Sequence, residues 1–172
     1  MELKEAIIKR RSVRDFLGRD IEDSIIMDIL EYANLAPSAG NLQARDFIVV
    51  RDRKKRERLM VSALDQEFVS EAPVDIVVCA NLKRISPYGE RGRNLYCIQD
   101  ASASIEHILL LAQEYGLATC WVGAFDEREV SEILNLPRWV RPVAIIPIGY
   151  PKHIPKPTPR KRIEELVHFD RW

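Results

Sequence analysis

The sequence has no long apolar run, no excess of either charge and no close pair of cysteines. Because no apolar run approaches the roughly 20 residues that cross a bilayer, we expect no membrane-spanning helix. Lysine plus arginine and aspartate plus glutamate both total 26. A net charge of zero argues against a nucleic acid or a membrane surface as partner and leaves self-association unopposed by repulsion. The charged N-terminus lacks an apolar segment, so we expect no signal peptide.

Cysteine is scarce, and the three thiols lie far apart with no C-x-x-C pair. They are Cys79, Cys97 and Cys120. An odd number of widely spaced cysteines predicts buried, reduced thiols, which suits a cytoplasmic location.

The common catalytic motifs are also absent. We find no G-x-G-x-x-G after a strand, no Walker A loop and no G-x-S-x-G turn. The histidines, at positions 107, 153 and 168, have no ligand spacing, so no metal site is expected. No acid–base pair is visible. If the chain is an enzyme, a cofactor therefore carries the chemistry.

What the sequence does contain is typical of one globular domain, since 47% of its 172 residues are hydrophobic and 30% are charged. Apolar periodicity predicts both helices and buried strands. Helices are expected over 2–10, 21–34, 52–64, 96–115 and 126–134, strands over 47–50, 74–79, 119–125 and 143–150, and loops over 37–41 and 83–94. Pro147 favours an edge position or a bulge in the last strand.

Arginine and serine gather where the first helix ends. Arg10, Ser12 and Arg14 alternate, so an extended segment would point them to one side, as an oxyanion site requires. A solvated basic helix end is the simpler alternative. Arg160–Arg162 form a second basic cluster that could meet the same phosphate. The small residues of 37–41 and Gly123 offer backbone amides and close approach to a planar ligand.

Two features suggest contact with a second subunit. The helix predicted over 96–115 is apolar nearly all round, so it needs covering on several sides. The proline-rich segment 151–159 is stiff and leads to apolar residues at the C-terminus. Either this tail is an arm that reaches a second subunit, or it ends in a helix that docks on its own domain.

Six segments in order resemble the FMN-dependent nitroreductase family and span almost the whole chain. They are R-R-S-V-R-D-F (10–16), A-P-S-A-G-N-L-Q (36–43), E-A-P-V-D-I-V-V (71–78), Q-D-A-S-A-S (99–104), G-L-A-T-C-W-V-G-A-F-D (116–126) and P-R-K-R-I-E-E-L-V-H (159–168). The resemblance implies an α+β fold, a three-layer αβα sandwich around a mixed, mostly antiparallel sheet. It further implies a single domain over 1–172 in an interlocked homodimer, with residues 150–172 as an exchanged C-terminal arm.

The resemblance also assigns roles to residues. Arg10, Ser12 and Arg14 match phosphate and ribityl contacts, and the 37–41 loop matches the segment that the other subunit contributes to the flavin. The Gly123 amide matches the donor that points at flavin N5, and Lys161 could replace a neighbouring arginine if the register slips by one. The implied FMN-binding residues are Arg10, Arg11, Ser12, Arg14, Pro37, Ser38, Ala39, Asn41, Gln66, Val122, Gly123, Ala124, Arg160 and Arg162, with Gly123 catalytic.

Two departures from the family pattern affect the expected pocket. Many members have two serines in the 37–41 loop, whereas this chain has Ala39 as the second residue. The chain is also short, which leaves little room for the inserted helices that shape the substrate pocket. The 83–94 loop, with Tyr88, Arg91 and Arg93, is expected to form that wall or lid instead.

The implied function is a ping-pong flavin cycle in the cytoplasm. NADH or NADPH reduces FMN, and a small organic acceptor such as a nitroaromatic or a quinone reoxidises it. Other FMN chemistry on the same fold, namely dehalogenation or an oxygen-dependent reaction, and a non-catalytic flavin carrier or sensor remain alternatives. The sequence does not choose between NADH and NADPH or identify the acceptor.

Overall fold

A sheet of four antiparallel strands in the order β1-β2-β4-β3 forms the middle layer of the molecule. The computed structural model describes every residue from Met1 to Trp172. The strands are β1 (Arg45–Val50), β2 (Val74–Asn81), β3 (Ala118–Thr119) and β4 (Val140–Gly149). The only parallel pairing is an isolated bridge between Ser12 and Thr119, so the sheet proper is less mixed than expected.

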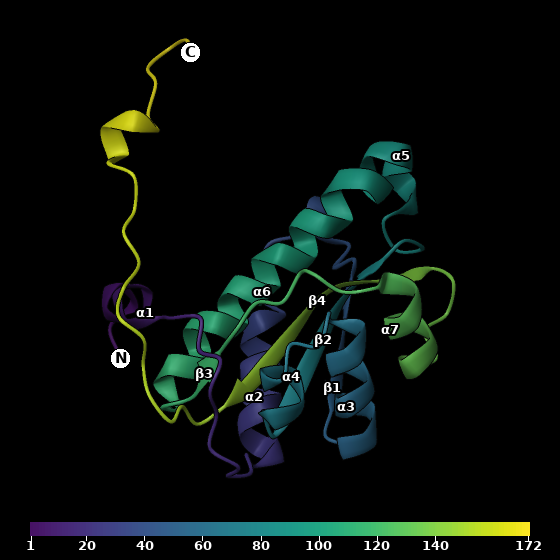
Figure 1. Cartoon of the computed structure of the whole chain (residues 1–172). Coiled ribbons are helices and arrows are strands. Elements are labelled where there is room, and N and C mark those ends of the chain that lie inside the picture. The colour runs from purple at the N-terminus through teal and green to yellow at the C-terminus, as the bar shows by residue number, and fades with distance from the viewer.

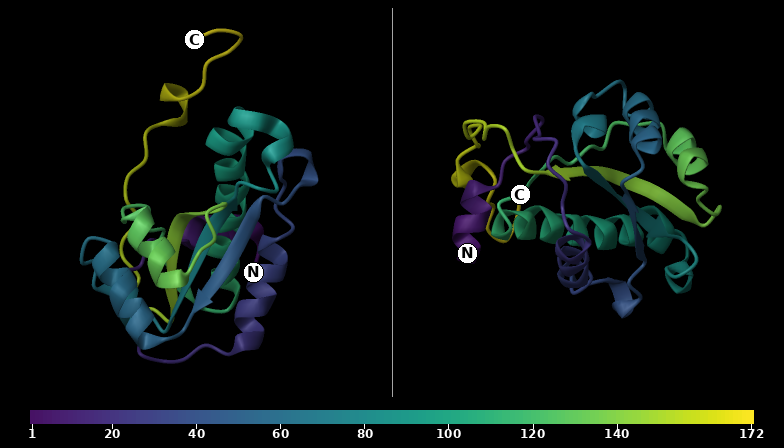
Figure 2. Two further views of the ribbon diagram at one scale, coloured as in Figure 1. Left: turned by 90° about the vertical axis from the view of Figure 1, so that its right-hand side faces the viewer. Right: turned by 90° about the horizontal axis from the view of Figure 1, so that it is seen from below.

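Helices cover both faces of this sheet, which confirms the predicted α+β sandwich (Figures 1 and 2). The helices α2 (Asp23–Ala33) and α6 (Cys97–Glu114) pack on one face. The other face carries α3 (Arg53–Ser62), α4 (Phe68–Glu71) and α7 (Glu127–Leu134). The N-terminal helix α1 (Leu3–Lys9) lies beside α6, where the N-terminal amine pairs with Glu114 at 2.6 Å. No helix combines the length and the apolar character that a membrane span requires.

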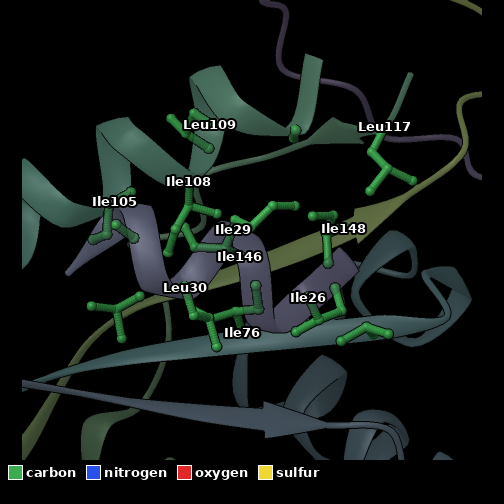
Figure 3. Close-up of a cluster of buried hydrophobic side chains, with 14 of the residues drawn as sticks. Ile26, Ile29, Leu30, Ile76, Ile105, Ile108, Leu109, Leu117, Ile146 and Ile148 are labelled. Atoms are coloured by element: carbon green, nitrogen blue, oxygen red, sulfur yellow. The ribbon is translucent and has the colours of Figure 1, made fainter. Parts of the chain in front are cut away.

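The inner strand β2 joins two hydrophobic cores, because all eight of its residues are buried. Ile76 and its alternate neighbours face α2 and α6, as period-two geometry dictates. Figure 3 shows Ile76 and Ile146 opposite Ile29 and Ile108 in this core. Val77 faces the second core, on the side of α3 and α4. Burying one such side chain contributes about 1.5–3 kcal/mol, so the sheet is fixed mainly by these two layers.

Pro147 is not at a sheet edge or in a bulge, so that prediction is wrong. It lies in the inner strand β4, opposite Asp75 of β2 in a regular part of the ladder. Its carbonyl oxygen accepts from the N–H of Cys120, so its ring nitrogen also faces the β3 side. The missing N–H therefore costs β2 no hydrogen bond. The irregularity in this pair of strands lies at Val78 and Cys79.

The predicted loop over 83–94 is helical instead. It forms a 3₁₀ turn (Ser86–Tyr88), the short helix α5 (Gly89–Arg91) and a π-helical turn (Gly92–Tyr96) that leads into α6. A side chain on Gly92 would lie 2.7 Å from Cβ of Tyr88 and 2.9 Å from the carbonyl oxygen of Ile85. Only glycine, which has no side chain, permits turns packed this closely. Gly92 suggests a loop when the sequence is considered alone, but in the structure it allows a compact helical segment.

The predicted strand over 119–125 is also much shorter than expected. Only Ala118 and Thr119 pair continuously with β4, and contact resumes at one bridge between Val122 and Ile145. Beyond that bridge the chain leaves the sheet and runs to α7 (Figure 1). The residues after Val122 are therefore a turn rather than part of a ladder.

The C-terminal residues from 151 first run beside the N-terminal segment, where the N–H of Lys152 donates to the carbonyl oxygen of Asp15, and beyond about residue 160 they run away from the body of the molecule (Figure 1). They contain only one 3₁₀ turn, Ile163–Glu165. Their apolar side chains are exposed, with Phe169 at 83% and Trp172 at 99%. The alternative of a C-terminal helix docked on its own domain is therefore wrong.

Candidate functional site

The segment from Arg10 to Phe16 is extended and lies alongside β3. The N–H of Val13 donates to the carbonyl oxygen of Thr119 at 3.0 Å. Val13 and Phe16 are buried, whereas Ser12 and Arg14 are exposed. The strand-like alternation that the sequence predicts is therefore present at Ser12, Val13 and Arg14.

The guanidinium groups of Arg10 and Arg14 have no carboxylate partner and make no hydrogen bond within the chain. Arg14 instead lies 5.8 Å from the ring centre of Phe68, a cation–π arrangement. Burial raises the pKa of the Cys120 thiol, and the positive charges of Arg14 and Arg10 oppose that rise. Two uncompensated positive charges therefore lie beside the buried end of β3.

A hollow of about 540 Å³ brings the first and last predicted clusters together. Its wall includes Arg10, Arg11, Ser12 and Arg14 from the N-terminal segment and Lys156, Thr158 and Arg160 from the C-terminal arm. Arg160 donates to Oγ1 of Thr158 at 2.6 Å. The hollow is strongly basic, which is what a dianionic phosphate requires.

Two predicted arginines have other contacts in this chain. Nη1 of Arg11 donates to the carbonyl oxygens of Ile8 at 2.6 Å and Arg10 at 2.8 Å, so this side chain caps the end of α1. Arg162 does not line the hollow, and its Nε pairs with Glu165 at 3.2 Å.

The turn after β3 offers free backbone donors. Val122 exchanges two backbone hydrogen bonds of 3.0 Å with Ile145, which fixes the start of the turn. The following residues, Gly123 and Ala124, are exposed, and their N–H groups donate to no other backbone atom. Nothing lies within 4 Å of the position that a Cβ on Gly123 would take, so that face of the turn is open.

Gln66 contacts this turn and is close in sequence to Phe68, which contacts the arginine segment. Its Nε2 donates to the carbonyl oxygen of Ala63 at 2.8 Å and reaches that of Ala124 at 3.4 Å. Two residues further on, Phe68 of α4 carries the Arg14 guanidinium. The arginine segment, Gln66 and the turn therefore belong to one side of the molecule.

The 37–41 loop lies elsewhere, against the N-terminal end of α6. Pro37, Ser38 and Ala39 share a hollow of about 520 Å³ with Tyr88, Tyr96, Gln99, Asp100 and Ala103. By contrast, Arg11 adjoins Gln113 and Leu117 at the C-terminal end of α6. A helix of 18 residues at 1.5 Å per residue is about 27 Å long, so α6 separates the two groups. One chain does not bring the loop to the arginine segment.

Two buried charged residues beside this loop escape prediction from sequence. Arg45 is 3% exposed and Asp100 is 4% exposed. Burial lowers the pKa of Arg45, and the negative charge of Asp100 raises it. The signal for Asp100 is a carboxylate on the buried face of α6, next to Ala101. Lys156, which lines the basic hollow, and Phe68, which lies under the Arg14 guanidinium, carry no comparable signal in the sequence.

Known proteins resemble this chain over most of its length. The nitroreductase family model matches residues 7–66 and 60–150. A protein of Archaeoglobus fulgidus with the provisional name NADH dehydrogenase/NAD(P)H nitroreductase is 36% identical over 156 residues, covering 88% of this chain and 86% of its own.

Solved structures give the same result. A provisionally named NADH dehydrogenase/NAD(P)H nitroreductase of Parabacteroides distasonis has a TM-score of 0.88 at 27% identity and covers 99% of this chain and 98% of its own. An NADPH:FMN oxidoreductase of Vibrio harveyi in complex with NAD⁺ has a TM-score of 0.92 at 25% identity, over 99% of this chain and 77% of its own. The chain belongs to the nitroreductase family.

Proposed function

We propose that this chain, as a homodimer, binds FMN and passes electrons from NADH or NADPH to a small organic acceptor such as a nitroaromatic or a quinone. Family membership makes it an NAD(P)H-dependent flavin oxidoreductase with FMN as cofactor. The single observation that carries the finer proposal is the hollow in which the unpaired Arg10 and Arg14 meet Arg160. Its charge is not balanced by any carboxylate of the hollow wall.

The residues present fit FMN. Arginine forks bind phosphate oxygens in pairs, and the Ser12 hydroxyl adds a neutral donor. The free N–H groups of Gly123 and Ala124 suit the polar edge of a ring, and Gln66 beside them supplies an amide. Nothing lies within 4 Å of a Cβ placed on Gly123, so a ring could approach the backbone there. The proposed phosphate and ring contacts thus come from one side of the molecule.

The proposed homodimer explains why the predicted site is divided. The 37–41 loop lies at the other end of α6 from Arg11, so a second copy has to supply that loop. Leu3, Ile7 and Ile8 of α1 are 66%, 53% and 69% exposed. Apolar side chains gathered in this way mark an interaction surface. The extended C-terminal arm, with Phe169 and Trp172 exposed, is the second such surface.

Bound FMN supplies a ring that accepts a hydride from a reduced nicotinamide and returns it to an acceptor. Arg10, Arg14 and Arg160 would hold the phosphate and neutralise its charge. The Gly123 N–H, whose position is fixed by the Val122–Ile145 bonds, would donate to the ring at N5. If the same open face received donor and acceptor in turn, the kinetics would be ping-pong. The three buried, unpaired thiols are compatible with the reducing cytoplasm that we propose as the location.

The test is an anaerobic titration of purified protein saturated with FMN. We expect stoichiometric flavin and bleaching of its visible absorbance by NADH or NADPH, followed by recovery when a nitroaromatic or a quinone is added. Initial rates against both substrates should give parallel double-reciprocal lines. Protein that binds FMN without bleaching would support a flavin carrier instead. Protein that binds no FMN would overturn the proposal.

A further inference from the structure

The 37–41 loop and its continuation have an unfavourable backbone conformation. Gly40, Asn41 and Gln43 all have positive φ, at 56°, 56° and 50°. Side chains make this left-handed region costly for Asn41 and more so for Gln43. Such residues persist only where their surroundings determine the conformation. The loop therefore needs contacts from outside itself.

Arg45 supplies one set of these contacts from the start of β1. Its Nη2 donates to the carbonyl oxygens of Asn34 at 2.6 Å and Ala36 at 2.8 Å, and its Nη1 reaches that of Pro37 at 3.4 Å. Carbonyl groups at the end of a helix have no partner within the helix. Arg45 thus ties the end of α2 to the start of the loop.

Asp100 supplies the second contact from the first turns of α6. Its Oδ1 accepts from the N–H of Ala39 at 2.9 Å, across 61 residues of sequence. Its Oδ2 is buried without a hydrogen-bond partner. Burial lowers the pKa of Arg45, and the negative charge of Asp100 opposes this larger effect.

The loop is also restricted by a hydrogen bond within it and by the side chain of Tyr88. Ser38 Oγ accepts from the N–H of Gln43 at 3.0 Å. A Cβ on Gly40 would lie 2.6 Å from the hydroxyl oxygen of Tyr88, so the phenol rests directly on the glycine. Ala39 and Leu42 also pack against a buried cluster that includes Ala80 of β2 and Cys97 of α6, and Arg84 donates to the carbonyl oxygen of Gln43 at 2.7 Å. Arg45 and Asp100 add the side-chain hydrogen bonds that tie the loop to β1 and to α6.

We propose that Arg45 and Asp100 are positioning residues for FMN: together they hold Pro37–Asn41 in the shape in which the loop meets the flavin of the partner subunit. This inference rests on the proposed function, since the two buried charged residues act on the flavin only through the loop that they hold. Loss of Asp100 would leave the Ala39 N–H without its acceptor, and loss of Arg45 would leave the carbonyl oxygens of Asn34 and Ala36 without their side-chain donor. The loop would then leave its left-handed conformation.

Asp100→Ala, Asp100→Asn and Arg45→Lys test this directly. Amide hydrogen exchange over residues 38–43 in flavin-free protein should accelerate at least tenfold in Asp100→Ala. The Kd for FMN should rise at least tenfold in the same variant, and the midpoint potential of the bound flavin should shift. Asp100→Asn keeps an oxygen that can accept from the Ala39 N–H. The changes in the exchange rate and in the Kd for FMN should therefore be less than half as large on a logarithmic scale. Arg45→Lys keeps the charge but cannot reach three carbonyl oxygens, so it should resemble Asp100→Ala.

Ile26→Ala is the control for general loss of stability, because Ile26 is buried in the core between α2 and the sheet. It should lower the melting temperature without changing exchange over 38–43 or the Kd for FMN. The inference fails if Ile26→Ala weakens FMN binding as much as Asp100→Ala at equal loss of stability. It also fails if Asp100→Ala and Arg45→Lys bind FMN within twofold of wild type. Wild-type protein that binds no FMN would refute the proposed function instead, while the exchange measurement still tests the attachment of the loop.

Discussion

The hydrogen bond from Val13 N–H to the carbonyl oxygen of Thr119, 3.0 Å long, connects the two parts of the proposed flavin surface. It aligns the arginine segment with β3, and β3 leads within four residues to the turn at Gly123. Because Val13 is buried there, its neighbours Ser12 and Arg14 face outward. The side chains that we assign to phosphate thus contribute little to the fold and can be changed separately from it.

Arg10→Ala combined with Arg14→Ala should release FMN and leave the protein folded. Each hydrogen bond between charged groups is worth about 1.5–3 kcal/mol. Losing two should weaken FMN binding roughly a hundredfold or more. Fluorescence titration with FMN measures the Kd, and circular dichroism checks the fold. Arg53→Ala, which removes an exposed arginine paired with Glu57 on α3, is the control for charge and should leave the Kd unchanged. A double variant that retains stoichiometric flavin would place the phosphate elsewhere.

Gly123→Ala should weaken FMN binding about tenfold without lowering the stability of flavin-free protein. The chain itself has nothing within 4 Å of the added methyl group. A ring lying against the Gly123 amide would meet that methyl group, and such overpacking costs about 1–3 kcal/mol. Gly18→Ala is the matched control, because Gly18 is equally open. If both variants bind FMN like wild type, the ring does not approach Gly123.

The sequence predicts β1, β2 and β4 well, because the sheet is covered on both faces, whereas β3 is much shorter than predicted. Val74 to Cys79 are all apolar except Asp75, and such a run has few alternatives to a buried strand. The segment around Gly92 is mispredicted because glycine and proline indicate a loop when their neighbours are unknown. In the structure Gly92 packs against Tyr88 and Ile85, and only the folded chain shows this.

The candidate site likewise has a part that the sequence predicts and a part that it does not predict. Alternation along Ser12, Val13 and Arg14 is local, so the sequence alone predicts it. The contacts of Arg45 with carbonyl oxygens and of Asp100 with the Ala39 N–H join distant segments and leave no periodic trace. Residues that shape a loop from outside it are therefore the part of this site that sequence reasoning misses.

Ile7→Asp should dissociate the proposed homodimer. Ile7 is 53% exposed on α1 in the single chain, and a buried charge at an interface costs several kcal/mol. Light scattering coupled to gel filtration should report the monomer mass, and FMN should be lost because the 37–41 loop is no longer supplied. Val61→Asp is the matched control, since Val61 is 57% exposed on α3 and should leave the mass unchanged. A dimeric Ile7→Asp protein would exclude α1 from the interface.

Asp75→Asn should remove a pH dependence of stability that the wild-type protein shows. Asp75 is fully buried in β2, neither carboxylate oxygen has a hydrogen-bond partner, and burial raises its pKa well above the ordinary value, against the opposing charge of Arg56. The folded state therefore keeps the proton at a pH where the unfolded chain has lost it. The contribution of Asp75 to wild-type stability falls as pH rises above about 4, by up to about 1.4 kcal/mol per pH unit, until the folded-state carboxyl ionises.

The neutral amide in Asp75→Asn binds no proton in either state, so the variant's advantage over wild type should grow with pH between about 4 and 7. Urea unfolding of both proteins at a series of pH values measures this difference. Asp65→Asn, which changes an exposed aspartate, should follow wild type at every pH. A constant difference between Asp75→Asn and wild type across the range would mean that Asp75 is ionised in the folded protein. The Arg56 guanidinium would then be its counter-ion rather than only the donor to the Ser70 and Ala72 carbonyl oxygens.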